Sequence, residues 1–431
     1  MIRVSLLGAS FFALALAAPA AAQDFDIVNA TVASGDGSEP VAGGTVSVRG
    51  GKVVYAGPDA GAPARATGTE IDGTGKWVTP GLVATLTTLG LSDVSGVSES
   101  NDIRPGNSPW GAALDVTPAI NPSSQHILVH RGAGITRAAT VTTPSKSIFG
   151  GQGAIIDLGA DAQPVTRAKA FQIVALGERG ARISGGSRAA SFVELAEALR
   201  EAAAYANGRW DAESATLPRA DAEALGAVVS GRQPLYVAVE RASDIRAVLG
   251  LKREMPRLDL VLLGASEGWL VAREIAAAGV PVIADGLDDL PNSFEELAST
   301  QSNVGRLVKA GVKVAINASA MENPRNLNQY AGNLVALSRI PGADGLSWGQ
   351  AFATITSVPA QISGLGASAG RLVPGATADV VIWDGDPLEV RSVPTRVFIE
   401  GIEQPLDSHQ TRLRDRYRDL DESDQPKAYD W

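Results

Sequence analysis

Few residue types in this 431-residue chain could do chemistry. It has no cysteine, which excludes disulfides, thiolate metal sites and cysteine nucleophiles. Its three histidines are His126, His130 and His409. The first two, in SSQHILVHRGAGIT, are four residues apart and would share a helix face, a spacing that zinc proteases use. That motif also needs Glu after the first histidine, where Ile127 stands, so we expect ordinary surface or half-buried histidines.

Polar side chains also follow several predicted strands. They are Glu240 and Arg241; Asp285, Asp288 and Asp289; and Asn317, Glu322, Asn323 and Arg325. One interpretation is a cleft for a small polar or peptide-like ligand, with Glu240 as a general base. The other is a set of solvated loop residues, some of them in salt bridges. Glu240 stands out because it ends an apolar strand, and burial without a partner would raise its pKa.

The elements that would position these groups alternate between strand and helix. Apolar segments at 235–240, 258–264, 280–285 and 312–317 are each followed by helical sequence, with helices predicted at 242–253 and 268–278. Capping boxes at Ser191 and Ser293 predict two more helix starts. This alternation indicates an α/β fold with a parallel sheet buried on both faces. Two regions with strand periodicity, 26–57 and 370–401, flank it.

Both ends of this alternating region carry a family resemblance. IDGTGKWVTPGL (71–82) and VPAQISGLGASAGRLVPGATADVVIWDGDPL (358–388) resemble the entry to and exit from the barrel of the amidohydrolase superfamily, particularly its imidazolonepropionase-like and prolidase-like members. The resemblance implies a (β/α)8 TIM-like barrel over residues 81–368. It also implies a small β-sandwich domain built from both chain ends, residues 23–80 and 369–405, and a charged C-terminal helix and tail over 406–431.

The resemblance breaks at the family's metal-ligand positions. Such chemistry needs a divalent cation, commonly zinc, held by imidazole and carboxylate groups at the ends of barrel strands. In WVTPGLVATLTTLGLSD (77–93), the family's His-x-His positions fall on Leu86 and Thr88. The later ligand positions fall on Ala238, Leu263 and Ser319. Leucine and alanine donate no lone pair, so we predict no bound metal or other cofactor.

Charge and the N-terminus bear on location and partners. The net charge of −10, without a basic stripe, argues against a nucleic-acid partner. Arg3, the apolar run 4–18 and Ala20-Ala21-Ala22 predict a signal peptide over residues 1–22, cut near Ala22-Gln23. We therefore expect an exported, periplasmic protein with no transmembrane segment in the mature chain. ISGGSRAASF (183–192) places glycines and Arg188 before a helix, where a carboxylate or phosphate could bind. Because the fuller phosphate-loop pattern is missing, we expect an ordinary flexible loop instead.

Three functional hypotheses follow. The leading one is a catalytically silent or altered amidohydrolase relative that binds a small ligand or supports an active paralogue. The second is a hydrolase of amide, cyclic amide or dipeptide bonds that works through carboxylates or a relocated metal. The third is a periplasmic binding protein, against which the two terminal motifs argue. By the same resemblance we expect a homo-oligomer.

Overall fold

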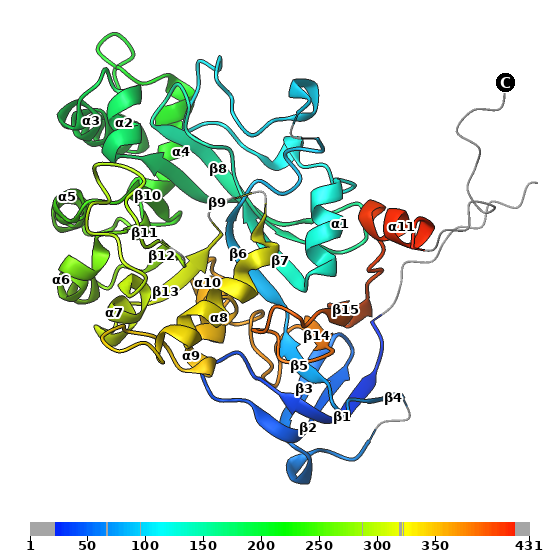
Figure 1. The fold of residues 1–431 in the computed structure, drawn as a ribbon. Helices are drawn as coiled ribbons and strands as arrows, with labels where there is room; N and C mark the ends of the chain where they lie inside the picture. The colour runs from blue at the N-terminus through cyan, green and yellow to red at the C-terminus, as the bar shows by residue number, and fades with distance from the viewer. Residues whose placement is uncertain are drawn as a thin grey trace, which may run out of the picture.

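The computed structural model describes residues 22–65, 68–94, 96–286, 288–318, 321 and 323–418. The predicted signal peptide lies outside these residues except for Ala22. Figure 1 shows a barrel wrapped by helices above a smaller sheet that contains both the first strands (blue) and the last ones (orange to red).

The smaller sheet combines the two ends of the chain. Its order is β16-β15-β14-β5-β1-β2-β3, and β4 pairs with β1. Its strands are β1 (Phe25–Val32), β2 (Val41–Arg49), β3 (Lys52–Pro58), β4 (Thr69–Asp72), β5 (Trp77–Pro80), β14 (Val380–Trp383), β15 (Pro394–Ile399) and β16 (Ile402–Glu403). The antiparallel pairing of β14 with β5 joins segments about 300 residues apart, from Val380 opposite Pro80 to Trp383 opposite Trp77. The sequence-predicted β regions therefore do meet.

The second sheet forms the barrel. Its eight strands run β13-β12-β11-β10-β9-β8-β7-β6. They are β6 (Leu82–Thr87), β7 (Ile135–Thr140), β8 (Phe149–Asp157), β9 (Val165–Ala175), β10 (Leu235–Val239), β11 (Leu260–Gly264), β12 (Val282–Asp285) and β13 (Val314–Asn317). The backbone at Thr354 and Ile355 hydrogen-bonds to both β13 and β6 and nearly closes the ring. The predicted TIM-like barrel is confirmed, with one departure: β8 runs antiparallel to both β7 and β9.

Helices cover the outside of the barrel, as the alternating pattern predicts. They are α1 (Gln125–Gly132), α2 (Gly177–Ile183), α3 (Arg188–Ala206), α4 (Arg219–Val229), α5 (Ala242–Glu254), α6 (Ala272–Ala278), α7 (Asn303–Lys309), α8 (Leu327–Leu337), α9 (Trp348–Ala353), α10 (Ser357–Ile362) and the short C-terminal α11 (His409–Arg416). Successive side chains of a strand point to opposite faces, and β10 shows this plainly. Leu235, Val237 and Val239 belong to the core beneath the helices, and Tyr236 belongs to a separate core inside the barrel. In the part of the chain that the structure describes, no helix is long and apolar enough to cross a membrane.

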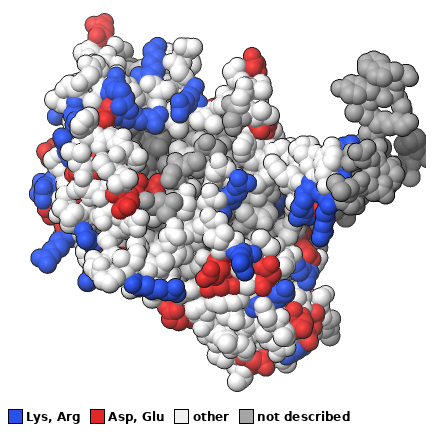
Figure 2. Space-filling view, viewed as in Figure 1, with Lys and Arg blue, Asp and Glu red and all other residues white. Residues whose placement is uncertain are grey.

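A buried arginine joins the barrel to the smaller sheet. Arg137 of β7 donates from Nε to Asp379 Oδ2 (2.7 Å) and from Nη2 to Asp379 Oδ1 (3.1 Å). Its Nη2 also reaches Glu400 Oε1 at 2.9 Å. Because Asp379 and Glu400 flank the strands of the C-terminal half of the smaller sheet, this network fixes that sheet against the barrel. On the face in Figure 2, acidic and basic side chains are mixed without a continuous basic stripe.

Candidate functional site

The interior of the barrel is apolar where metal ligands are expected. Of the positions that match family ligands, Leu86 and Leu263 lie in one buried hydrophobic cluster, and the partly buried Ala238 packs against it. Leu86 is 8% exposed and Leu263 is 5% exposed. Their neighbours in the cluster include Val141, Phe171, Tyr236, Val261, Ile283 and Ala315. The structure therefore brings these positions together, as the resemblance implies, but as packing residues.

Of the other two matched ligand positions, Thr88 lies within the described residues. Thr88 is buried at the end of β6, and its backbone N–H donates to Met321 O at 3.3 Å. Ser319 lies outside the described residues, as does the cleft candidate Glu322. A threonine hydroxyl is a poor ligand for zinc.

The donors present do not fit the divalent metal that the family implies. Leucine and alanine side chains offer no electron pair, and a cation placed among them would lose its hydration without compensation. Within the described ranges, no three His, Cys, Asp or Glu side chains are grouped so that they could hold a metal ion. We therefore derive no chemical step through a metal.

Carboxyl groups gather instead at the rim, where β10, β11 and β12 end. Glu240 follows β10 on the same side as Tyr236 and Ala238, so its side chain lies at the mouth of the barrel. Its Oε2 accepts hydrogen bonds from Ser266 N (3.0 Å) and Ser266 Oγ (2.8 Å). Ser266 Oγ also lies 2.8 Å from Asp288 Oδ2. A serine hydroxyl has one hydrogen and can donate to only one of these carboxylates. Both contacts are hydrogen bonds when one of the two carboxyl groups carries a proton and donates it to Ser266 Oγ.

The surroundings favour such a shared proton. Burial raises the pKa of Glu240 to about 7, and the nearby Glu296 and Asp288 add to the rise, against the lowering effect of the Ser266 hydrogen bonds. Burial likewise raises the pKa of Asp288, together with Asp285 and Glu296. The position of the Glu240 carboxyl group requires glycine at position 264, which has φ +81°. A Cβ there would come within 1.9 Å of Glu240 Oε1. Among the described side chains, no Lys or Arg forms an ion pair with Glu240 or Asp288.

The remaining sequence-predicted candidates are only partly brought together. Asp285 lies near enough to raise the pKa of Asp288, and it pairs across the sheet with Asn317. Asn317 Nδ2 donates to Ala318 O (3.1 Å). Arg241 caps α5 without a side-chain cap bond. Arg325 lies elsewhere, in a groove lined by α1, residues 390–394 and the start of α11.

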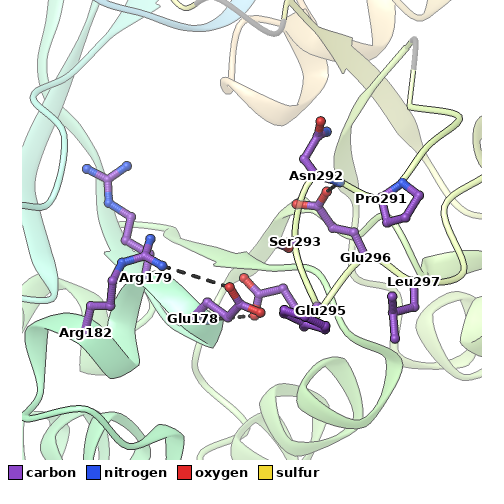
Figure 3. A pocket seen from close by; sticks show the side chains of 10 residues that line it. Glu178, Arg179, Arg182, Pro291, Asn292, Ser293, Glu295, Glu296 and Leu297 are labelled. Carbon is purple, nitrogen blue, oxygen red and sulfur yellow. Dashed lines mark hydrogen bonds and ion pairs between the residues drawn. The ribbon is translucent and has the colours of Figure 1, made fainter.

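A cavity at this rim has a volume of about 640 Å³. It opens between α2, which follows β9, and the segment 291–297 that follows β12. It is lined by Glu178, Arg179, Arg182, Pro291, Asn292, Ser293, Phe294, Glu295, Glu296 and Leu297. Figure 3 shows the arginines on one side, Asn292 and Glu296 on the other, and Glu178 and Glu295 between them. Such a volume suits a small molecule.

The glycine-rich segment before α3 does not offer a free anion site. Arg188 Nε lies 3.1 Å from Asp244 Oδ2, and Arg188 Nη2 lies 3.1 Å from Glu295 Oε2 and 3.6 Å from Glu178 Oε1. Glu295 Oε2 also accepts a hydrogen bond from Glu178 N at 2.7 Å. The protein's own carboxylates therefore surround the arginine that the sequence suggested for a ligand.

The histidines lie away from the rim, but His130 is only 1% exposed, so the prediction of surface or half-buried histidines is wrong for this residue. His126 and His130 are on α1, which packs against β7 and β15 on the outside of the barrel. Nδ1 of His130 lies 2.5 Å from His126 O, and burial lowers the pKa of His130 to about 4. His409 is exposed at the start of α11.

Sequence reasoning missed Ser266, Glu296 and Arg179. Ser266 lies two residues beyond β11, so polarity immediately after a predicted strand was the available signal, as it was for Glu240. Glu296 and Arg179 had a weaker signal because they lie on a long connection and on a seven-residue helix. Glu296 and Arg179 line the same cavity only because the two connections fold over the end of the barrel.

Comparison with known proteins agrees with the fold. A model of the amidohydrolase family matches residues 270–397. The chain is 24% identical over 371 residues to Amidohydrolase tasK of Hapsidospora irregularis, a match that covers 77% of this chain and 37% of tasK. The chain thus spans little more than a third of that relative. It is also 25% identical over 368 residues to an imidazolonepropionase of Acidiphilium cryptum (strain JF-5), covering 81% of this chain and 89% of that protein.

Solved structures show the same architecture. The crystal structure of an amidohydrolase from Thermotoga maritima MSB8 superposes with a TM-score of 0.76 at 24% identity, covering 88% of this chain and 99% of that one. Molinate hydrolase gives a TM-score of 0.53 at 16% identity, covering 90% and 95%. At these identities, the structural likeness concerns the fold alone. Together with the family match over residues 270–397 and the sequence relatives, it supports the resemblance of this chain to the amidohydrolase superfamily.

Proposed function

We propose that this chain is an exported, catalytically silent or altered amidohydrolase relative that binds a small ligand at the rim of its barrel without metal chemistry. The observation that carries the proposal is the apolar cluster that contains Leu86 and Leu263 and against which Ala238 packs. Among the described residues, these three positions match family ligands and lie at the barrel interior. All three side chains take part in hydrophobic packing. A fold does not by itself establish a function, so the altered site has the greater weight.

The rim supports ligand binding in place of metal chemistry. The cavity of about 640 Å³ lies where TIM-like barrels bind their ligands, at the carboxyl ends of the strands. Charged groups and apolar groups both line it. Support of an active paralogue is the other role that a retained scaffold with an altered site would serve. The N-terminal sequence supports export to the periplasm.

Elemental analysis tests this proposal directly. Protein purified without chelator, from medium supplemented with zinc and manganese, should contain far less than one metal ion per chain. An aliquot treated with EDTA should have the same melting temperature and the same ligand affinity. One or two tightly bound equivalents, removed together with a hydrolytic activity, would show that the proposal is wrong.

A second function, hydrolysis of carbon–nitrogen bonds, is favoured by the carboxyl pair at Ser266. A carboxyl group with a pKa near 7 can both accept and return a proton at neutral pH, which general acid–base catalysis requires. In this version Glu240 activates water, and the protonated form supplies the leaving amine with its hydrogen. Glu240→Gln would then abolish turnover of an amide or dipeptide panel. Glu274→Gln, on an exposed ion pair with Arg246, would not. Lack of any cleavage above blank by the wild type removes this candidate.

The periplasmic binding protein alternative has no structural support. Such proteins have two hinged lobes, and this chain forms a barrel joined to one sheet made from both its ends.

A further inference from the structure

One wall of the rim cavity carries two arginines, Arg179 and Arg182, and Arg182 is paired with Glu178. Arg179 is half-buried, and its Nη2 donates to the backbone carbonyl of Pro144. Within the described chain it has no ion pair with a carboxylate. Burial lowers the pKa of Arg179, and the neighbouring guanidinium groups of Arg104 and Arg182 lower it further. The nearest acid on the same helix, Glu178, is 3.9 Å from Arg182 and 3.6 Å from Arg188.

The opposite wall presents negative charge. Glu296 lines the cavity, and its Oε2 accepts only a backbone hydrogen bond, from Asn292 N at 3.0 Å, among the described contacts. Glu296 also lies close enough to raise the pKa of both Glu240 and Asp288. The acidic groups of the rim therefore crowd one another on this side, as the arginines do on the other.

Apolar side chains line the cavity on the side of Glu296, while Glu178 and Glu295 lie between the two walls. Pro291, Phe294 and Leu297 come from the same segment as Glu296, and Phe294 and Leu297 are 78% and 64% exposed. Figure 3 shows the guanidinium of Arg179 standing apart from the acidic side chains, with open space between it and Glu296. Glu295 does not fill this space, because Arg188 and the start of α2 hold it.

We propose that this cavity binds a zwitterionic small molecule, with its anionic group on Arg179 and its cationic group on Glu296. The ligand would have a short apolar body, which packs against Phe294 and Leu297. It supplies a counter-charge to Arg179 and to Glu296, and charge-assisted hydrogen bonds make both contacts selective. The inference rests on the proposed ligand-binding role and specifies the class of ligand.

A series of ω-amino acids tests the inference, because it varies the separation of the charges while the chemistry stays constant. The probes are glycine, β-alanine, 4-aminobutyrate and 6-aminohexanoate. Hexanoate and hexylamine carry one charge each, and 2-aminoethylphosphonate replaces the carboxylate by a phosphonate. Binding is measured by isothermal titration calorimetry. We expect one length to bind about tenfold or more tightly than either singly charged probe. Comparison of 2-aminoethylphosphonate with β-alanine shows which anion the arginines prefer.

Two variants test which side chain binds which charged group of the ligand. Arg179→Gln should abolish the advantage over hexylamine, and Glu296→Gln should abolish the advantage over hexanoate, each with about tenfold weaker binding. Arg200→Gln and Glu274→Gln make the same charge changes at exposed ion pairs outside the cavity and should leave affinity unchanged. Absence of binding across the whole series, or a preference that survives in both cavity variants, overturns the inference. Metal analysis reports separately on the proposed function, so the two failures are distinguishable.

Discussion

At the scale of single residues, a few side chains determine the apolar character of the barrel interior. Leucine at positions 86 and 263 fills the interior with hydrocarbon. Just after β10, two residues beyond Ala238, Glu240 introduces a carboxyl group that the hydroxyl of Ser266 links to Asp288. The same barrel end thus passes from an apolar floor to a polar rim. Such a floor is suited to excluding water and ions from beneath a ligand.

The raised pKa of Glu240 predicts a pH-dependent stability. Folding raises this pKa from its usual value of 4.5 to about 7, so the folded state holds a proton that the unfolded chain releases. The free energy of unfolding should fall as the pH rises from about 4.5 to about 7, then level off. With allowance for solvent screening, the loss is of the order of 2 kcal/mol. Urea unfolding at a series of pH values measures it.

Glu240→Gln should flatten this pH dependence, since glutamine keeps a similar shape and does not titrate. Glu274→Gln, at an exposed ion pair, is the matched control and should retain the full slope. A slope that is equally steep in Glu240→Gln would show that other carboxyl groups cause it.

The packing role of the matched ligand positions predicts a large cost for shortening them. Leu263→Ala should lower the free energy of unfolding by about 2 to 5 kcal/mol, because Leu263 is 5% exposed inside the barrel. Leu270→Ala, at a residue that is 46% exposed, should cost less than about 1 kcal/mol. Denaturant titration of both variants checks this. Similar small losses in both would mean that the barrel interior is not a packed core.

At the scale of elements, sequence periodicity predicted the strands and helices of the second half of the barrel well. The helix predicted at 242–253 is α5 (Ala242–Glu254), and the segment 312–317 contains β13. Here each strand is apolar and each helix amphipathic, so local pattern and tertiary packing agree. The reversal of β8 was not predictable in this way, because its residues are buried at every position and their pattern carries no direction.

Two helix starts were predicted wrongly, for identifiable reasons. Ser191 lies inside α3, where its Oγ donates to Arg188 O, and the helix begins at Arg188. Ser293 starts no helix, because Glu296 accepts from Asn292 N and Glu295 is held by Arg188. The glutamates of the predicted capping box at Ser293 thus make other contacts, Glu295 with Arg188 and Glu296 with the backbone of Asn292. The candidate site shows the same limit: Glu240 was recognisable at a strand end, whereas its partners come from connections whose course only the folded structure gives.

Gly177 leaves space for Glu295, through which the segment 288–299 contacts the start of α2. Gly177 has φ +61°, and a Cβ there would come within 2.3 Å of Glu295 Oε2. Gly177→Ala should therefore displace Glu295 from the start of α2, in addition to the roughly 1–2 kcal/mol of backbone strain. Gly185 has φ +76° with nothing within 4 Å of a Cβ, so Gly185→Ala reports the strain alone.

The two glycine variants should differ in the rim cavity as well as in stability. We expect Gly177→Ala to lose more free energy of unfolding than Gly185→Ala, and to weaken ligand binding. Denaturant unfolding and calorimetry with the tightest ω-amino acid measure the two effects. Equal losses in both variants would mean that Glu295 can move without cost.

At the scale of the whole molecule, strand pairing and a buried ion pair join the chain ends to each other and to the barrel. The smaller sheet needs both ends, because β14 inserts between β5 and β15. Its strand residues Val380, Val381 and Trp383 have no exposed surface. Asp379, just before β14, holds Arg137 of the barrel. Removal of one end would therefore expose a sheet edge and leave a buried guanidinium without its main partner.

This dependence predicts opposite outcomes for two C-terminal truncations. A chain that stops after Ala378 lacks β14, β15 and β16, and we expect it to be insoluble or unfolded. A chain that stops after Ser408 loses α11, which buries no residue, and should keep its melting temperature within about 2 °C. Circular dichroism and thermal melting of both products provide the test. A folded, soluble chain that ends at Ala378 would show that the barrel is stable without the C-terminal strands, and that Arg137 tolerates burial without Asp379.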